Sequence, residues 1–256
     1  MSSKESPTKT IVVALLLSLV CSVVVSTAAI KLKPIQQKNQ TLDKKRNILV
    51  AAGMMEDKSS ADVEALFSQV EAKFVDLASG EFVEEPAGFD QRAFAKDAAT
   101  NLVLTAEQDL GGIGKRSQIA NVYIVKKDGQ LDSIIFPIHG KGLFSTLYGF
   151  IALDKDLKTV KGLKYYEHGE TPGLGAEVEN PSWLAKWPGK QVLDANGEPV
   201  LALVKNVADD NNEVDALSGA TWTTNGVESM IHFWLGDNGF GPFIDNVRAQ
   251  IAKGDL

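Results

Sequence analysis

The chain has 256 residues, of which 44% are hydrophobic and 23% are charged, which is enough for one sizeable core or two small ones. Residues 1–46 hold eight basic and two acidic residues, whereas the rest of the chain holds 18 basic and 31 acidic residues. Such an acidic body argues against nucleic acid as a partner. The single cysteine excludes an intrachain disulfide, and three histidines are fewer than zinc or haem proteins usually carry.

The most apolar stretch lies near the N-terminus, where "TIVVALLLSLVCSVVVSTAAI" (residues 10–30) has no charge over 21 positions. As a helix it would span about 31 Å, the thickness of a bilayer's hydrocarbon core. The alternative is a cleaved signal peptide, with "STAA" as the cleavage site, but the apolar run is longer than such peptides have. We therefore expect a transmembrane helix at 10–30, a polar neck at 31–58 and a folded domain at 59–256. The basic residues after the helix favour a cytoplasmic position for that flank, a rule that weakens when a large domain follows.

The remaining elements alternate between helical and β-rich patterns. Ser59 or Ser60 is expected to cap a helix whose apolar face is Val63, Leu66, Phe67, Val70 and Phe74. Residues 121–138 predict a hairpin turning at Asp128-Gly129, and residues 147–168 predict a second hairpin. "EPVLALVKNV" is a further strand candidate, and helices are expected at 226–235 and 243–252. Strands in the middle with helices at both ends predict an α+β domain with an antiparallel sheet flanked by helices.

A dense cluster of hydroxyls occurs in "DALSGATWTTNG" (residues 215–226). Asn225 and Glu228 resemble a capping box, so we expect a helix from about Gly226 whose free N–H groups attract an anion, phosphate above all. Gly219 and Ala220 are small enough for a ligand to approach the backbone. The alternative is that the hydroxyls of Ser218, Thr223 and Thr224 only cap the helix.

Two other loops carry glycine and isolated polar side chains. "EHGETPGLGAE" (residues 167–177) is an irregular loop in which Leu174 could press on a flat ring. "HGKGLFSTLYG" (residues 139–149) places Lys141 between glycines, where it would neutralise a phosphate or simply be solvated. "GGIGKR" (residues 111–116) lacks the spacing and the Ser/Thr of a phosphate-binding P-loop.

"DALSGAT" resembles the flavinylation motif of the FMN-binding domain family, and "ETPGLG" and "GKGLFSTLYGF" resemble its companion motifs. Together with the ending "FWLGDNGFGPF" and the N-terminal anchor, they make the chain similar to the family of C subunits of bacterial sodium-translocating NADH:quinone reductases. The similarity is densest from about Asn121 to the end.

This resemblance implies that FMN is joined through its phosphate to the hydroxyl of Thr221, as a phosphodiester. Asp215 would serve recognition by a separate flavin transferase. The wall of the isoalloxazine pocket would come from the loop of Glu170, with Leu174 on the ring and Lys141 on the opposite side. The implied cofactor-binding residues are Asp215, Ser218, Gly219, Ala220, Thr221, Thr223, Thr224, Glu170, Thr171, Gly173, Leu174, Lys141, Gly142 and Leu143.

The resemblance also implies an electron carrier without catalytic residues or a metal of its own. Its flavin would take one electron from one redox centre and pass it to the next, while other subunits bind NADH, sodium and quinone. The domain would face the periplasm from the bacterial inner membrane, with residues 1–9 in the cytoplasm. The alternatives are the flavoprotein subunit of an Rnf-type ferredoxin:NAD reductase, or a non-redox membrane-anchored assembly module.

Overall fold

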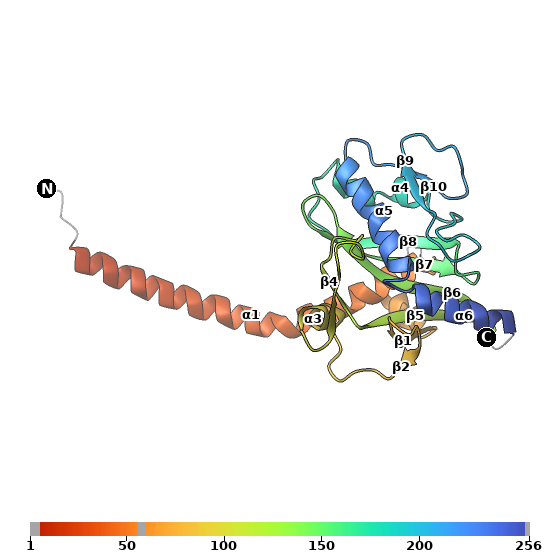
Figure 1. Cartoon of the computed structure of the whole chain (residues 1–256). Helices are drawn as coiled ribbons and strands as arrows, with labels where there is room; N and C mark the ends of the chain where they lie inside the picture. The colour runs from red at the N-terminus through yellow and green to blue at the C-terminus, as the bar shows by residue number, and fades with distance from the viewer. Residues whose placement is uncertain (1–5, 56–59, 254–256) are drawn as a thin grey trace. The chain divides into compact units, whose positions relative to one another are not determined.

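The computed structural model describes residues 6–55 and 60–253, and the predicted capping residue Ser59 lies outside them. Its first element is α1 (Pro7–Ala51), a helix of 45 residues that includes the predicted span and continues through most of the predicted neck (Figure 1). Within the described residues, α1 alone is long and apolar enough to cross a membrane. The chain divides into two compact units at Lys44/Lys45, so the end of α1 belongs to the folded body.

A six-stranded antiparallel sheet forms the centre of the body, in the order β2-β1-β5-β6-β7-β8. The four consecutive strands β5, β6, β7 and β8 lie side by side as a meander. Short turns connect them, which is possible only between antiparallel neighbours. Asp128 and Gly129 both adopt positive φ between β5 and β6, which confirms the predicted hairpin turn. The strands are β1 (Val70–Asp76), β2 (Phe82–Val83), β5 (Ile119–Lys127), β6 (Gln130–Lys141), β7 (Thr146–Asp154) and β8 (Val160–Glu167).

The first predicted helix of the body is shorter than expected. Helix α2 (Ser60–Phe67) ends before Val70 and Phe74, which lie in β1 and pair with Val125 and Asn121 of β5. The assignment of these two residues to the helix was therefore wrong. Val70, Phe74 and Val75 fit a pleated surface, and pairing along the whole of β1 outweighs the helical spacing that they share with α2.

Helices α5 (Thr221–Leu235) and α6 (Gly241–Lys253) cover one face of the sheet (Figure 1). Their apolar side chains join those of alternate strand residues, such as Val122 and Phe136, in one buried cluster. Trp234 is fully buried there, and its indole N–H donates to the carbonyl of His139 in β6 over 2.6 Å. Helix α5 is thus fixed against β6, the strand that ends in Lys141.

The opposite face of the sheet is covered by the end of α1 and by α2. Ile48, Leu49 and Ala51 are buried, and the ring of Phe67 meets that of Tyr123 edge-on at 6.3 Å. Side chains alternate between the two faces of a strand, so residues such as Val125 and Ala152 fill this second core while their neighbours fill the first. The predicted start of the folded domain at residue 59 thus leaves out part of this core.

Short elements complete the body and connect the sheet to the site. Strands β9 and β10 pair in parallel, and β10 directly precedes the hydroxyl-rich segment. The candidate strand at residues 198–207 is reduced to the three residues of β9. These elements are α3 (Gln91–Lys96), β3 (Asn101–Val103), β4 (Lys115–Ser117), η1 (Gly175–Glu179), α4 (Pro181–Leu184), β9 (Ala202–Val204) and β10 (Glu213–Asp215).

Gly162 of β8 lies directly under the carbonyl oxygen of Ala51, so a side chain at this position would overlap backbone. We expect Gly162→Ala to lower the free energy of unfolding by about 1–3 kcal/mol, because α1 must shift off the sheet. Guanidinium unfolding of the full chain in mild detergent, followed by tryptophan fluorescence, measures this, since all four tryptophans lie between residues 183 and 234.

Gly111→Ala is the matched control, because its added methyl group would meet the ring of Phe233 at an ordinary 3.5 Å. We expect it to change stability by less than about 0.5 kcal/mol. Equal effects of the two substitutions would contradict the proposed packing of Ala51 on β8.

Candidate functional site

Three segments that are distant in sequence meet at the carboxylate of Glu170. One oxygen accepts hydrogen bonds from the amides of Phe144 (3.0 Å) and Ser145 (3.2 Å). The other accepts from the amide of Leu143 (3.3 Å) and from the hydroxyl of Thr223 (2.7 Å) in the first turn of α5. This carboxylate therefore joins the loop after β6, its own loop after β8, and the start of α5.

Glu170 is ionised in this position although its side chain is buried, at 5% exposure. Burial raises the pKa of its carboxyl group, but the hydrogen bonds from Thr223 and from the amides of residues 143–145 outweigh it, so the pKa lies below its usual value. The site closes tightly around the charge. A Cβ on Gly142 would lie 2.5 Å from one oxygen of Glu170, and a Cβ on Gly175 would lie 2.7 Å from the other.

Helix α5 begins at Thr221, five residues before the start predicted from the capping box. The capping-box prediction was wrong, because Asn225 lies inside the helix and the carboxylate of Glu228 accepts from the amide of Leu203 instead (2.6 Å). The first turn is stabilised by Thr224. Its hydroxyl donates to the carbonyl of Ala220 (3.0 Å) and accepts from the amide of Leu217 (3.1 Å).

No side chain caps the N-terminus of α5, which begins at Thr221. Ala220 is the N-cap residue and has no side-chain hydrogen bond to offer to the first turn. Gly219 adopts φ +73° in the turn before it, a conformation that favours glycine. Thr221 itself is exposed, whereas Thr223 and Thr224 are buried. The uncapped helix end is therefore a site for an anionic group beside an accessible hydroxyl.

Asp215 is held in place by the segment that follows the Glu170 loop. Its backbone carbonyl accepts from the indole N–H of Trp183 over 2.7 Å, and its carboxylate pairs with the ammonium group of Lys186 over 2.6 Å. Both side chains of this ion pair are about half exposed. The carboxylate thus stands at the surface, six residues before Thr221.

Exposed apolar side chains surround the start of α5. Leu143 and Leu174, both predicted as site residues, are 45% and 44% exposed, and a Cβ on Gly219 would lie 3.1 Å from Leu174. Phe144 and Trp222 are 68% and 72% exposed. Neither aromatic residue was predicted as part of the site, although each directly follows a predicted site residue in the sequence. Large exposed apolar side chains that gather in one place indicate a ligand or partner surface.

The other predicted residues take supporting positions. Lys141 is exposed at the end of β6, where its amide donates to the carbonyl of Gly111 (2.8 Å). The carbonyl of Thr171 accepts from the amides of Leu174 and Ala176 and so shapes the loop in which Gly173 takes φ +75°. Ser218 and Gly219 are exposed, whereas Ala220 is buried. The structure thus brings all three predicted segments to one place.

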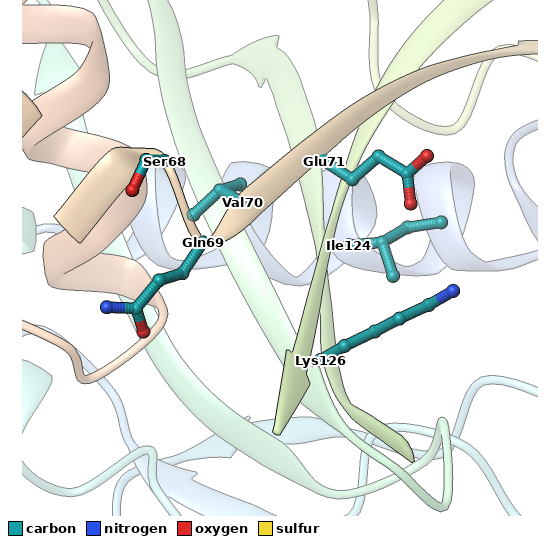
Figure 2. Close-up of a pocket in the computed structure, with 6 residues that line it drawn as sticks. All are labelled: Ser68, Gln69, Val70, Glu71, Ile124 and Lys126. Carbon is teal, nitrogen blue, oxygen red and sulfur yellow. The ribbon is translucent and has the colours of Figure 1, made fainter. Parts of the chain in front are cut away.

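A separate hollow of about 310 Å³ lies at the other end of the β5–β6 hairpin (Figure 2). It is open, and its polar groups do not converge on one point. Leu131 pairs with Lys126 and lies ten positions before Lys141 along β6, which corresponds to roughly 30 Å. The hollow is therefore distinct from the site. Its lining residues are Ser68, Gln69, Val70, Glu71, Ile124 and Lys126.

The antiparallel sheet, the uncapped helix end and the apolar rim are features that a domain binding a phosphorylated, ring-containing ligand would need. In agreement, residues 142–236 match the FMN-binding domain family. Among the C subunits of Na(+)-translocating NADH-quinone reductases, that of Yersinia pestis is 46% identical over 98% of this chain and 97% of its own length. That of Pseudomonas aeruginosa is 48% identical over 97% and 98%.

Among solved structures, NqrC of Shewanella oneidensis superposes with a TM-score of 0.77 and 35% identity, covering 82% of this chain and 99% of the other. The corresponding protein of the Na(+)-translocating NADH-quinone reductase of Parabacteroides distasonis gives 0.64 and 28%, covering 84% and 96%. The chain belongs to the family of Na(+)-translocating NADH-quinone reductase C subunits.

The charge of Glu170 should make stability depend on pH. Because its pKa is lower in the folded chain, its contribution is present above the unfolded value of 4.5 and is lost as the pH falls through the folded pKa. We expect Glu170→Gln to cost about 1–3 kcal/mol at pH 7, since the amides of residues 143–145 lose a charged acceptor. The free energies of unfolding of the variant and the natural chain should converge below pH 4.5.

Glu85→Gln, in an exposed loop, is the matched control and should leave both stability and its pH dependence unchanged. Denaturant unfolding of the natural chain and both variants between pH 7 and pH 3 measures these free energies. A constant difference between Glu170→Gln and the natural chain over this range would show that the carboxylate is not the titrating group.

Proposed function

We propose that this chain is a covalent flavoprotein subunit that carries electrons in a sodium-pumping NADH:ubiquinone oxidoreductase. FMN is attached through its phosphate to the hydroxyl of Thr221, and the flavin relays single electrons between redox centres of the complex. The names of the relatives support the assignment of this chain to such a complex. The match to the FMN-binding domain family supports FMN as its cofactor. The exposed position of Thr221 at the start of α5 is the observation that best supports covalent attachment at this residue.

Thr221 combines the two properties that an attachment residue needs. Its side chain is exposed, and it is the first residue of an uncapped helix whose free amides and dipole stabilise a negative charge. Thr223 and Thr224 are buried, with their hydroxyls bonded to Glu170 and Ala220. Among the threonines of the motif, Thr221 is therefore the residue that a modifying enzyme can reach and whose product the helix stabilises.

The surroundings of α5 also fit the flat ring of the flavin. Leu174 and Leu143 present apolar surface on two loops that Glu170 holds together. Gly173, with φ +75°, turns the loop of Leu174, and Gly142 leaves room for the carboxylate below. The loops thus provide apolar contacts for a flat ring.

When bound, FMN supplies the one-electron and two-electron redox chemistry that no amino acid in this chain provides. The residues of the chain have a different task, namely to fix the ring and to set its surroundings. Glu170 places a buried negative charge next to the loops of the site. We assign sodium passage to other subunits, because α1, the one helix in the described residues that is long and apolar enough to cross a membrane, offers no path for an ion. We assign the binding of NADH and quinone to other subunits as well.

Maturation requires a separate flavin transferase, and Asp215 is the residue that we assign to its recognition. Its half-exposed carboxylate is fixed by Lys186, and its backbone is fixed by Trp183. The carboxylate is therefore available at a defined position, where the transferase or its metal ion can bind it. Ser218 and Gly219, exposed between Asp215 and Thr221, leave the approach to the hydroxyl open.

The apolar part of α1 anchors the chain in the bacterial inner membrane, and we assign the body to the periplasmic side. The basic residues between Lys31 and Arg46 favour the opposite orientation. We give this bias less weight, because a large folded domain follows a single anchor.

Two alternatives have less support. The flavoprotein of an Rnf-type ferredoxin:NAD reductase shares the flavin motif, but the relatives that cover 97–98% of this chain are named as C subunits of Na(+)-translocating NADH-quinone reductase. A non-redox assembly module would use the hydroxyls only as caps. The uncapped N-terminus of α5 and the exposed Thr221 argue against this use.

Co-expression of the full chain with a flavin transferase tests the attachment. We expect the mass of the denatured chain to increase by FMN minus water, because the phosphodiester bond replaces the hydroxyl proton of Thr221 and one hydroxyl group of the FMN phosphate. Thr221→Ala should abolish this increase, whereas Thr105→Ala, at an exposed threonine outside the three segments of the site, is the control that retains it. An unchanged mass of the natural chain, with a transferase shown to be active on another substrate, would refute covalent attachment.

Cysteine labelling tests the orientation, since Cys21 is the only cysteine and can be replaced by serine. In that background, Gln250→Cys places a thiol on the exposed face of α6 and Lys9→Cys places one before the span. We expect a membrane-impermeant maleimide to label Gln250→Cys in spheroplasts and Lys9→Cys only after lysis. The reverse pattern would place the body in the cytoplasm.

A further inference from the structure

Trp222 is the most exposed of the four tryptophans, at 72%, while Trp183, Trp187 and Trp234 are exposed by 7% or less. It directly follows the attachment residue Thr221, so the two Cα atoms are about 3.8 Å apart. An indole ring left in water next to a ligand site has no role in the packing of the body. Its position therefore calls for a partner outside the protein core.

The helical spacing shows in which direction Trp222 projects. Residues four apart lie on one face of a helix, so Trp222 shares its face with Gly226. At Gly226 this face meets the end of β6: a Cβ there would overlap the carbonyl oxygen of Lys141 and lie 3.4 Å from the Cα of Gly142. One turn earlier, Trp222 is thus directed toward the loop that follows Gly142.

Phe144, 68% exposed, lies in that loop. Its amide and the hydroxyl of Thr223, the residue after Trp222, bind the two oxygens of one carboxylate, that of Glu170, at 3.0 Å and 2.7 Å. The backbones that carry the two aromatic side chains are therefore held close together. Leu143 and Leu174 continue the same apolar surface.

We propose that Trp222 packs face to face on the isoalloxazine ring of the flavin tethered at Thr221, with Phe144 at its edge. This proposal rests on the covalent attachment proposed above and adds an aromatic contact to it. A flavin bound through the neighbouring residue is confined within reach of the indole, so stacking costs little additional entropy. It also removes the exposed surface of Trp222 from water.

Flavin fluorescence provides the test, because an indole in contact with an excited flavin donates an electron to it and the pair then recombines without net chemistry. Phenylalanine cannot donate in this way, whereas tyrosine can. With FMN attached to the full chain in each case, we expect Trp222→Phe to lengthen the flavin fluorescence lifetime several-fold. Trp222→Tyr should restore the short lifetime, and Phe82→Leu, at an exposed phenylalanine outside the site, should leave the lifetime unchanged.

A second measurement uses the natural chain and does not depend on any variant being flavinylated. A tryptophan-selective benzyl bromide reagent should modify Trp222 in the chain without FMN, since the other three indoles are buried. Peptide mass spectrometry should show Trp222 protected once FMN is attached. Trp222 that remains equally reactive after flavinylation would overturn the proposal.

The two proposals fail in different ways. If the natural chain gains no FMN, the covalent attachment itself is refuted. If FMN is attached, but Trp222 stays reactive and Trp222→Phe leaves the lifetime unchanged, the attachment stands and the aromatic contact is refuted. Trp222 would in that case be available to a partner protein.

Discussion

The buried carboxylate of Glu170 is the interaction on which the arrangement of the site depends. It accepts hydrogen bonds from a loop 25–27 residues before it and from a helix residue 53 positions after it. A buried charge is tolerated only when it is well hydrogen-bonded, and the amides of residues 143–145 in turn need an acceptor. The carboxylate and the amides therefore depend on each other. Their hydrogen bonds hold the three segments of the site together without a bound ligand.

Hydrogen bonding also explains the dense hydroxyl cluster of the motif. Thr223 ties α5 to Glu170, and Thr224 ties the first turn to the preceding loop through Leu217 and Ala220. These two threonines hold the helix end in place, so neither caps it in the usual way. Thr221 is left exposed at an N-terminus that no side chain caps.

Helices pack on both faces of the sheet that supports this site. Helices α5 and α6 fill one face, and the end of α1 with α2 fills the other, with Gly162 allowing the backbone of Ala51 to approach β8. The apolar N-terminal segment thus continues, in one helix, into the residues Ile48, Leu49 and Ala51 of the second core. The final residues of this helix are part of the body and do not form a separate neck.

The sequence by itself determined what local pattern and motif chemistry can encode. It predicted the apolar span, two of the three hairpins of the meander, the α+β class and the three segments of the site, because turn residues and strand alternation act over short distances. Only the tertiary structure decided the rest. Val70 and Phe74 joined β1 by pairing with β5, and Glu228 bound Leu203 while α5 began at Thr221. Each of these outcomes depends on a partner distant in sequence, as does the meeting of Glu170, Thr223 and Phe144.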